Sequence, residues 1–173
     1  MKSTVLLLAA LIAAVGCASS PAPVALPAID NATSPALGIV SAGRLASADI
    51  ARLREAGIRE VIDLTPDAET PDFDESAAVR TAGLSYSNLP LRGAVDLTRE
   101  NVLAFDALLR AAKRPLLVHC ASGNRVGAIA ALRAAWVDGR NAEDAIGIGK
   151  AWGLKSLESE VRRKLDGART SAP

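Results

Sequence analysis

Short apolar runs alternate with amphipathic segments along most of this chain. Four runs have the length and the bounding turn residues of strands, and they lie at 38–42, 60–64, 84–89 and 115–118. Helical patterns lie at 75–82, 126–133, 142–150 and 154–165, and two more helices are expected to begin after the capping residues Ser47 and Thr98. This alternation, with a wholly apolar strand at 115–118, predicts an α/β fold: a central, mainly parallel sheet of four to five strands, flanked by helices.

The N-terminus has the pattern of a targeting segment. Lys2 precedes an apolar stretch at 5–14 that is short for a membrane span. Residues 14–17, Ala-Val-Gly-Cys, resemble the lipobox of bacterial lipoprotein signal peptides. The resemblance implies cleavage before Cys17 and lipidation of that residue. No Asp follows Cys17, so it further implies a periplasm-facing anchor in the outer membrane. An ordinary secretory signal with a coincidental cysteine is the alternative.

Composition divides the chain into four parts. We expect a lipoprotein signal peptide at 1–16, the lipidated cysteine with a flexible Ala/Pro/Ser tether at 17–37, one domain at 38–168, and a disordered tail at 169–173. The net charge of the 173 residues is +1, with acidic and basic residues interspersed, so no nucleic-acid partner is expected. Because aromatic residues make up only 3%, aliphatic side chains must fill the core.

The run at 119–125, His-Cys-Ala-Ser-Gly-Asn-Arg, joins the apolar strand to the next helix. A small-residue loop that opens a helix presents several unpaired N–H groups at the positive end of the helix dipole, a combination that favours an anion. The same surroundings favour the thiolate form of Cys120, and thiolate is the nucleophilic form. Arg125 adds a planar, permanently charged group suited to binding two oxyanion oxygens.

Cysteine usage bears on the role of this loop. If Cys17 carries lipid, Cys120 is the one thiol left and no disulfide can form within the chain. An unpaired thiol in an oxidising compartment calls for either a chemical role or burial. A buried, inert cysteine is therefore the alternative to a nucleophile.

The spacing His119-Cys120-x4-Arg125 resembles the signature loop of cysteine-dependent phosphatases of the tyrosine and dual-specificity types. The flanking segments are more similar to a bacterial branch, the beta-lactamase-hydrolase-like or dual-specificity-like phosphatases. They are Ser-Ala-Gly-Arg at 41–44, Gly-Ile-Arg-Glu-Val-Ile-Asp-Leu at 57–64, Gly-Leu-Ser-Tyr-Ser-Asn-Leu-Pro at 83–90 and Pro-Leu-Leu-Val-His-Cys at 115–120. The resemblance covers roughly 38–157 and implies a cysteine-phosphatase-like fold.

The resemblance also implies roles for the loop residues. Cys120 would attack phosphorus to give a phosphocysteine intermediate, and His119 would orient the loop through a hydrogen bond. Phosphate would be held by Arg125 and by the backbone N–H groups of Ala121, Ser122, Gly123 and Asn124. The implied reaction uses no metal and no organic cofactor, and its substrate is a phosphorylated molecule of unidentified class.

Asp96 is the candidate general acid, because the segment before the helix at Thr98 resembles the acid-bearing loop of dual-specificity phosphatases. The alternative is that Asp96 helps to cap that helix. Asp72 and Asp74 are weaker candidates. Arg44 and Arg92 follow strand ends, so either they bind substrate anions or they are simply exposed.

Two departures from the resemblance keep other functions open. Four residues separate Cys120 from Arg125, one fewer than in most phosphatases and the same as in many rhodanese sulfurtransferases, which carry a cysteine persulfide. Val126 stands where both families usually have Ser or Thr. Phosphoester hydrolysis is therefore the main hypothesis. Sulfur transfer through a Cys120 persulfide is the second, and a non-catalytic envelope lipoprotein that binds an oxyanion or a partner is the third.

Overall fold

The computed structural model describes residues 26–170, the last three as backbone only. Its strands are β1 (Thr33–Ala36), β2 (Ile39–Ala42), β3 (Glu60–Asp63), β4 (Ser85–Asn88) and β5 (Leu116–His119). Its α-helices are α1 (Asp49–Glu55), α2 (Glu75–Thr81), α3 (Arg99–Ala111), α4 (Asn124–Trp136), α5 (Ala142–Ala151) and α6 (Glu158–Thr170). Two 3₁₀ turns, η1 (Asp67–Glu69) and η2 (Ala94–Asp96), lie in the connections after β3 and β4. None of the described helices is long and apolar enough to cross a membrane.

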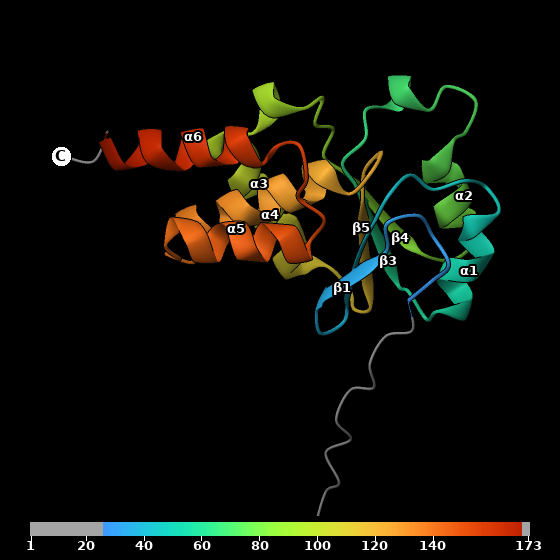
Figure 1. Cartoon of the computed structure of the whole chain (residues 1–173). Coiled ribbons are helices and arrows are strands. Elements are labelled where there is room, and N and C mark those ends of the chain that lie inside the picture. Colours follow the sequence, from blue (N-terminus) through green and yellow to red (C-terminus); the bar gives the residue numbers. More distant parts are fainter. Residues whose placement is uncertain (1–25, 171–173) are drawn as a thin grey trace, which may run out of the picture.

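The sheet has the order β1-β2-β5-β3-β4, and every pairing except that of β1 with β2 is parallel. Helices α1 and α2 cover one face, and α3 to α6 cover the other (Figure 1). Side chains alternate across β5, so Leu116 and Val118 pack with α3 to α6 whereas Leu117 packs with α1 and α2. The predicted α/β architecture is confirmed, with five strands.

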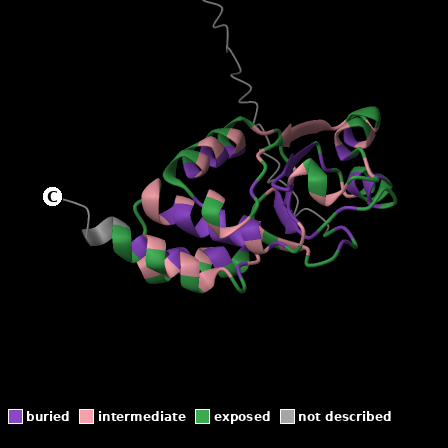
Figure 2. Ribbon diagram, turned by 90° about the horizontal axis from the view of Figure 1, so that it is seen from above, coloured by how far each residue is buried: buried purple, intermediate pink, exposed green. Residues whose placement is uncertain are grey.

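Helix α4 is the central helix of the larger layer, and most of its residues are buried (Figure 2). Its close approach to α5 depends on glycine. A Cβ atom at Gly127 would lie 2.0 Å from the backbone N of Leu154, and one at Gly149 would lie 2.8 Å from the carbonyl O of Gly127. The sequence places the two glycines where side chains would separate the helices.

The predicted tether is wrong at its C-terminal end. Residues 33–36 form β1, which pairs with β2 at the edge of the sheet, and Ile29 is buried against the α1 side. The hydroxyl of Thr33 donates to Ala151 O (3.0 Å), so this segment is held by the domain. A short Pro-containing stretch carries little periodic signal of its own, because its burial depends on distant neighbours.

Several predicted boundaries also need correction. Helix α1 is preceded by Ala48, and no side-chain cap comes from Ser47. Helix α4 starts two residues earlier and ends three later than predicted, whereas α6 begins at Glu158 and continues to Thr170 into the expected tail. The cap at Thr98 is confirmed, since its hydroxyl accepts a bond from Asn101 N (3.2 Å). The predicted signal peptide and Cys17 lie outside the described residues.

Candidate active site

The loop that carries Cys120 leaves the carboxyl end of β5 and turns directly into α4. Gly123 occupies the N-cap position with φ of 81°, a left-handed conformation that favours glycine. An isolated bridge between Gly43 and Ser122 ties the loop to the end of β2, and Arg44 N donates to Ala121 O (3.3 Å). Cys120 is fully buried at the base of the loop. The strand–loop–helix arrangement expected from the sequence is confirmed.

The loop presents unpaired backbone donors. Within residues 26–170, no acceptor pairs with the amide N–H of Ala121, Ser122, Asn124, Arg125 or Val126. These groups surround the first turn of α4, where the helix dipole also favours negative charge. Neighbouring N–H groups of this kind form a concave binding site for an anion.

Arg125 is held so that one edge of its guanidinium remains available. Its Nη1 and Nη2 donate to the two carboxylate oxygens of Glu69, at 2.8 and 2.7 Å, and Nη1 also donates to Leu91 O. These bonds use three of its five N–H donors and leave Nε–H and one Nη2–H, which share an edge. Burial lowers the pKa of Arg125, but Glu69 and the Cys120 sulfur outweigh burial and raise it. The sulfur and the guanidinium therefore lie close enough for their charges to interact.

Glu69 is a site residue that the sequence did not indicate. It ends η1, and Arg44 contacts it as well: Nη1 donates to its carbonyl O (2.7 Å), and Nη2 lies 3.7 Å from its carboxylate. The hydrogen bond from Arg125 lowers the pKa of Glu69 and keeps it ionised. In the sequence, Glu69 is a single Glu in an acidic loop, and it lies 56 positions before Arg125, so no local pattern links the two residues.

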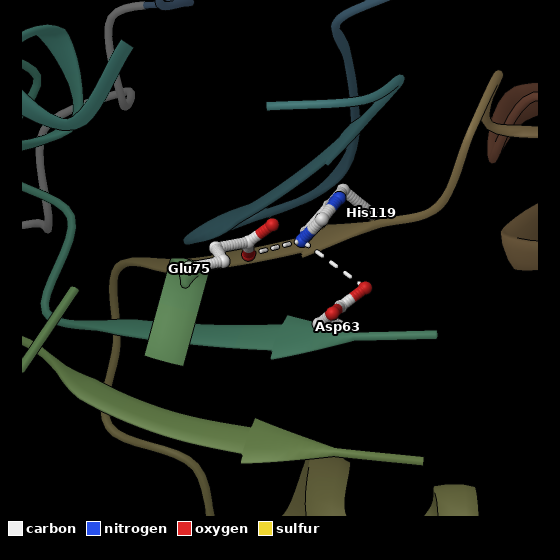
Figure 3. Close-up of side chains that lie close together, drawn as sticks. All are labelled: Asp63, Glu75 and His119. Carbon is white, nitrogen blue, oxygen red and sulfur yellow. Dashed lines mark hydrogen bonds and ion pairs between the residues drawn. The ribbon is translucent and has the colours of Figure 1, made fainter. Parts of the chain in front are cut away.

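His119 is buried on the other face of β5. Its Nε2 lies 2.7 Å from Glu75 Oε1 and 3.4 Å from Asp63 Oδ1 (Figure 3). Asp63 accepts further bonds from Thr65 N (2.6 Å), the Tyr86 hydroxyl (2.9 Å) and Asn88 Nδ2 (3.3 Å). His119 thus ties the start of the loop to the first residue of α2. The hydrogen bond expected of it is present, and its carboxylate partners are new.

The side chain of Asn124 does not face the anion-binding loop but anchors it to the α5–α6 connection. Its Oδ1 accepts from the backbone N of Lys155 (2.8 Å) and of Leu157 (3.3 Å), and its Nδ2 donates to Ser156 Oγ (2.7 Å). A Cβ at Gly153 would lie 3.0 Å from Gly123 O, so this connection packs directly on the loop. Segments 31 to 33 positions apart in the sequence therefore hold the loop in place.

Asp96 lies in η2 and is occupied by Arg92. Its carboxylate accepts bonds from Arg92 N, Nε and Nη2, at 2.8, 2.9 and 2.8 Å. The Arg92 side chain lowers the pKa of Asp96 to about 2, which leaves no proton to donate at neutral pH. Its side chain does not cap α3 either, because Thr98 does so. In this arrangement the geometry does not support the predicted general acid.

Val126 is fully buried within the larger core. It places no hydroxyl beside the loop, in keeping with the departure seen in the sequence. Asp72 and Asp74 belong to the segment between η1 and α2, where the Asp74 side chain accepts from Ala77 N (2.9 Å) and caps α2. Among residues 26–170, neither aspartate forms a hydrogen bond or ion pair with the Cys120 loop.

Comparison with known proteins places this geometry in a family. Residues 31–137 match the family model described as beta-lactamase hydrolase-like protein, phosphatase-like domain. The chain is 36% identical over 103 residues to a beta-lactamase hydrolase-like protein of Xylella fastidiosa, and 31% identical to one of Agrobacterium fabrum. These alignments cover 57% of this chain but 23% of each relative, so the chain spans about a quarter of their length.

Solved structures agree with the family match. A Neisseria meningitidis protein proposed to be a phosphatase superposes with a TM-score of 0.67 at 25% identity, over 79% of this chain and 97% of its own. P. aeruginosa TpbA, crystallised with phosphotyrosine, gives a TM-score of 0.59 at 20% identity, over 88% of this chain and 100% of its own. The second likeness shows a shared fold. Together with the family match, these findings confirm a phosphatase-like domain.

Proposed function

This chain belongs to the family of beta-lactamase hydrolase-like protein, phosphatase-like domain, and on that premise we propose that it hydrolyses phosphate monoesters through Cys120. The observation that carries the proposal is a buried cysteine in the same short loop as an arginine with one free guanidinium edge, beside backbone amides that have no acceptor among residues 26–170. A phosphate group supplies the oxygens that these donors lack.

Binding follows from the donors on each side of the loop. Nε–H and the remaining Nη2–H of Arg125 bind two phosphate oxygens. Glu69 and Leu91 O accept bonds from the other three N–H groups and so fix the orientation of the guanidinium. Amides at the start of α4 bind the other oxygens. Donors arranged before the reaction stabilise the charge that develops in the transition state without reorganising.

The chemistry proceeds in two displacements. The Cys120 thiolate forms an S–P bond while the P–O bond to the leaving group breaks, and the leaving oxygen departs as an anion that takes its proton from solvent. Water then attacks the phosphocysteine, the S–P bond breaks, and inorganic phosphate and the thiolate are released. Val126 offers no hydroxyl to assist departure of the sulfur, so the second displacement is expected to limit turnover.

The substrate class follows from the state of Asp96. Because three hydrogen bonds from Arg92 occupy that carboxylate, it is not placed to protonate a leaving group, and a leaving group that departs without protonation is favoured. Aryl phosphates, including phosphotyrosine, have such leaving groups, whereas alkyl phosphates such as phosphoserine do not. We therefore propose aryl phosphates as the preferred substrates.

The test compares hydrolysis of p-nitrophenyl phosphate by the full chain and by Cys120→Ser. We expect the variant to lose at least about a thousandfold in rate, since the nucleophile is removed. Intact mass after rapid quenching should show one phosphoryl group on the wild type and none on the variant. Turnover that survives Cys120→Ser would overturn the proposal, as would an unmodified wild-type protein that hydrolyses no phosphoester.

Sulfur transfer is the second candidate, favoured by the four-residue spacing between Cys120 and Arg125. It predicts that thiosulfate adds one sulfur atom to Cys120 and that cyanide then releases thiocyanate. The same mass measurement separates the two enzymatic functions. An anion that raises Tm with neither adduct would instead favour the non-catalytic hypothesis.

We further propose that the chain is anchored to the cell envelope through lipid on Cys17, facing the periplasm. The support is the sequence at 14–17, since the residue lies outside the described part. Mass spectrometry of the mature N-terminus in its native host should find a diacylglyceryl group on Cys17. An N-terminus at another residue would overturn this proposal.

A further inference from the structure

A second cluster of chemically active side chains lies on the α1 and α2 side of the sheet, away from the Cys120 sulfur. It opens to a cavity of about 330 Å³. Four carboxylates line that cavity, from Asp63, Asp67, Asp74 and Glu75, and no Lys or Arg within residues 26–170 does. The Tyr86 side chain also lines it, and the Tyr86 hydroxyl donates to Asp63 Oδ2 (2.9 Å). The cavity is therefore an electronegative site.

Three metal-ligand atoms meet at the inner end of this cavity. One atom each from Asp63, Glu75 and His119 lies within 4.8 Å of the others, and all three residues are buried (Figure 3). They come from the ends of β3 and β5 and from the start of α2. The sheet and helix frame therefore places them together without a flexible loop.

The cluster contains more acceptors than the protein satisfies. Glu75 has a side chain only 6% exposed, and its Oε1 contacts His119. Its Oε2 has no hydrogen-bond partner among residues 26–170, although Glu75 lines the cavity. Two buried carboxylates thus converge on one imidazole nitrogen. Buried acidic groups that outnumber their basic partner favour a bound cation.

We propose that Asp63, Glu75 and His119 bind a divalent transition-metal cation, with water from the cavity completing its coordination. One imidazole nitrogen and two carboxylates suit Zn²⁺ or Mn²⁺ better than Ca²⁺ or Mg²⁺, which prefer oxygen ligands alone. On binding, the lone pair of His119 Nε2 coordinates the metal in place of its hydrogen bond to Glu75, and the ring proton then lies on Nδ1. His119 Nδ1 has no other hydrogen-bond partner among the described residues.

This site is independent of the proposed hydrolysis. His119 and Cys120 are neighbours in sequence, but their side chains point to opposite faces of β5. Cys120 belongs to the core under α4, whereas Tyr86 and Phe73 beside the cavity belong to the α1 and α2 side. Metal binding can therefore be measured whether or not the chain is a phosphatase.

The test measures uptake of Zn²⁺ and of Mn²⁺ by the full chain after EDTA treatment, using equilibrium dialysis and elemental analysis. The protein carries Cys17→Ser and Cys120→Ser, so that no thiol competes for metal. We expect one equivalent of Zn²⁺ or Mn²⁺ to bind, and Ca²⁺ and Mg²⁺ to bind at least about tenfold more weakly.

Glu75→Gln is the decisive variant, because an amide keeps the shape and an acceptor for His119 but removes the charge. It should weaken metal binding by more than about tenfold. Asp72→Asn is the matched control, since it removes one carboxylate from the same connection and Asp72 does not line the cavity. No uptake by the folded parent protein, or equal uptake by Glu75→Gln, would overturn the proposal. Should Glu75→Gln fail to fold, an anomalous scattering peak away from the three residues in Zn²⁺-loaded crystals of the parent protein would overturn it.

Discussion

At the end of β5, His119 and Cys120 face two regions of opposite electrostatic character. On the Cys120 side, backbone amides and one edge of Arg125 are donors without acceptors among residues 26–170. On the His119 side, two buried carboxylates share one imidazole nitrogen, and two more line the adjoining cavity. Since an unpaired buried polar group is costly, each region favours a ligand of the opposite charge. Adjacent residues at the end of one strand thus belong to a candidate anion site, at Cys120, and to a candidate cation site, at His119.

The connection between β3 and α2 takes part in both regions. Glu69 reaches from it to Arg125, whereas Asp67 and Asp74 line the electronegative cavity. The two regions therefore differ in the groups that they present, hydrogen-bond donors in one and carboxylates in the other, but they share one supporting segment. Substitutions at four positions test the Cys120 side of this comparison, with effects that decrease from Arg125 to Asp96.

Arg125→Ala should impair anion binding on the Cys120 side and leave the His119 side unchanged. We expect hydrolysis of p-nitrophenyl phosphate to fall about a hundred- to a thousandfold, because preorganised donors to the transition state are lost. Arg125→Lys should recover only part of this loss, since an ammonium cannot offer two parallel donors. Steady-state kinetics provide the measurement, with the exposed Arg140→Ala as the control. Full activity in Arg125→Ala would remove this residue from the site.

Gly127→Ala should disturb the packing of α4, the helix that follows the Cys120 loop, against α5. Its Cβ would lie 2.0 Å from Leu154 N, so α4 and α5 must separate, and we expect a loss of about 1–3 kcal/mol in the free energy of unfolding. Gly147→Ala on the same helix pair is the control, because its Cβ meets nothing within 4 Å. That variant should gain about 1 kcal/mol in urea denaturation, as alanine favours a helix. Equal stabilities would contradict the close packing.

Glu69→Gln should loosen Arg125 without removing it. An amide keeps one acceptor but loses the charge-assisted pair of bonds, so kcat/KM should fall by about tenfold, equivalent to ~1.4 kcal/mol. The pKa of Glu69 is lowered in the folded protein, so its contribution to stability is present above its unfolded value and is lost as pH falls through the folded value. Acid unfolding of wild type and variant should therefore converge at low pH. A constant difference between them would contradict the ion pair.

Asp96→Asn should have the smallest effect. Arg92 holds Asp96 as an anion with a pKa of about 2, so we expect turnover of p-nitrophenyl phosphate to change by less than about threefold. A general acid would instead contribute about a hundredfold or more. The measurement is kcat/KM across a series of aryl phosphates, because kcat/KM reports on the first displacement. A loss that grows as the leaving group becomes more basic would restore Asp96 as the acid.

Local sequence was sufficient to predict many of the strands and helices of this domain and the position of the Cys120 loop. The strand at 115–118, the loop at 119–125 and the following helix are contiguous, so Cys120 and Arg125 had to lie on one turn of chain. Alternation of strands and helices likewise predicted the parallel sheet and its flanking layers. Periodic patterns record which face of an element is buried, and that information is local.

Tertiary structure decided which distant groups complete each region. Glu69 meets Arg125 across 56 positions, Glu75 meets His119 across 44, and Asn124 meets Leu157 across 33. Residues 33–36 became a strand only because β2 offered an edge. Asp96, predicted as an acid from its place before α3, is held by Arg92 instead. The sequence shows that a carboxylate is present, but the packing of the elements determines which partner sets its pKa and its orientation.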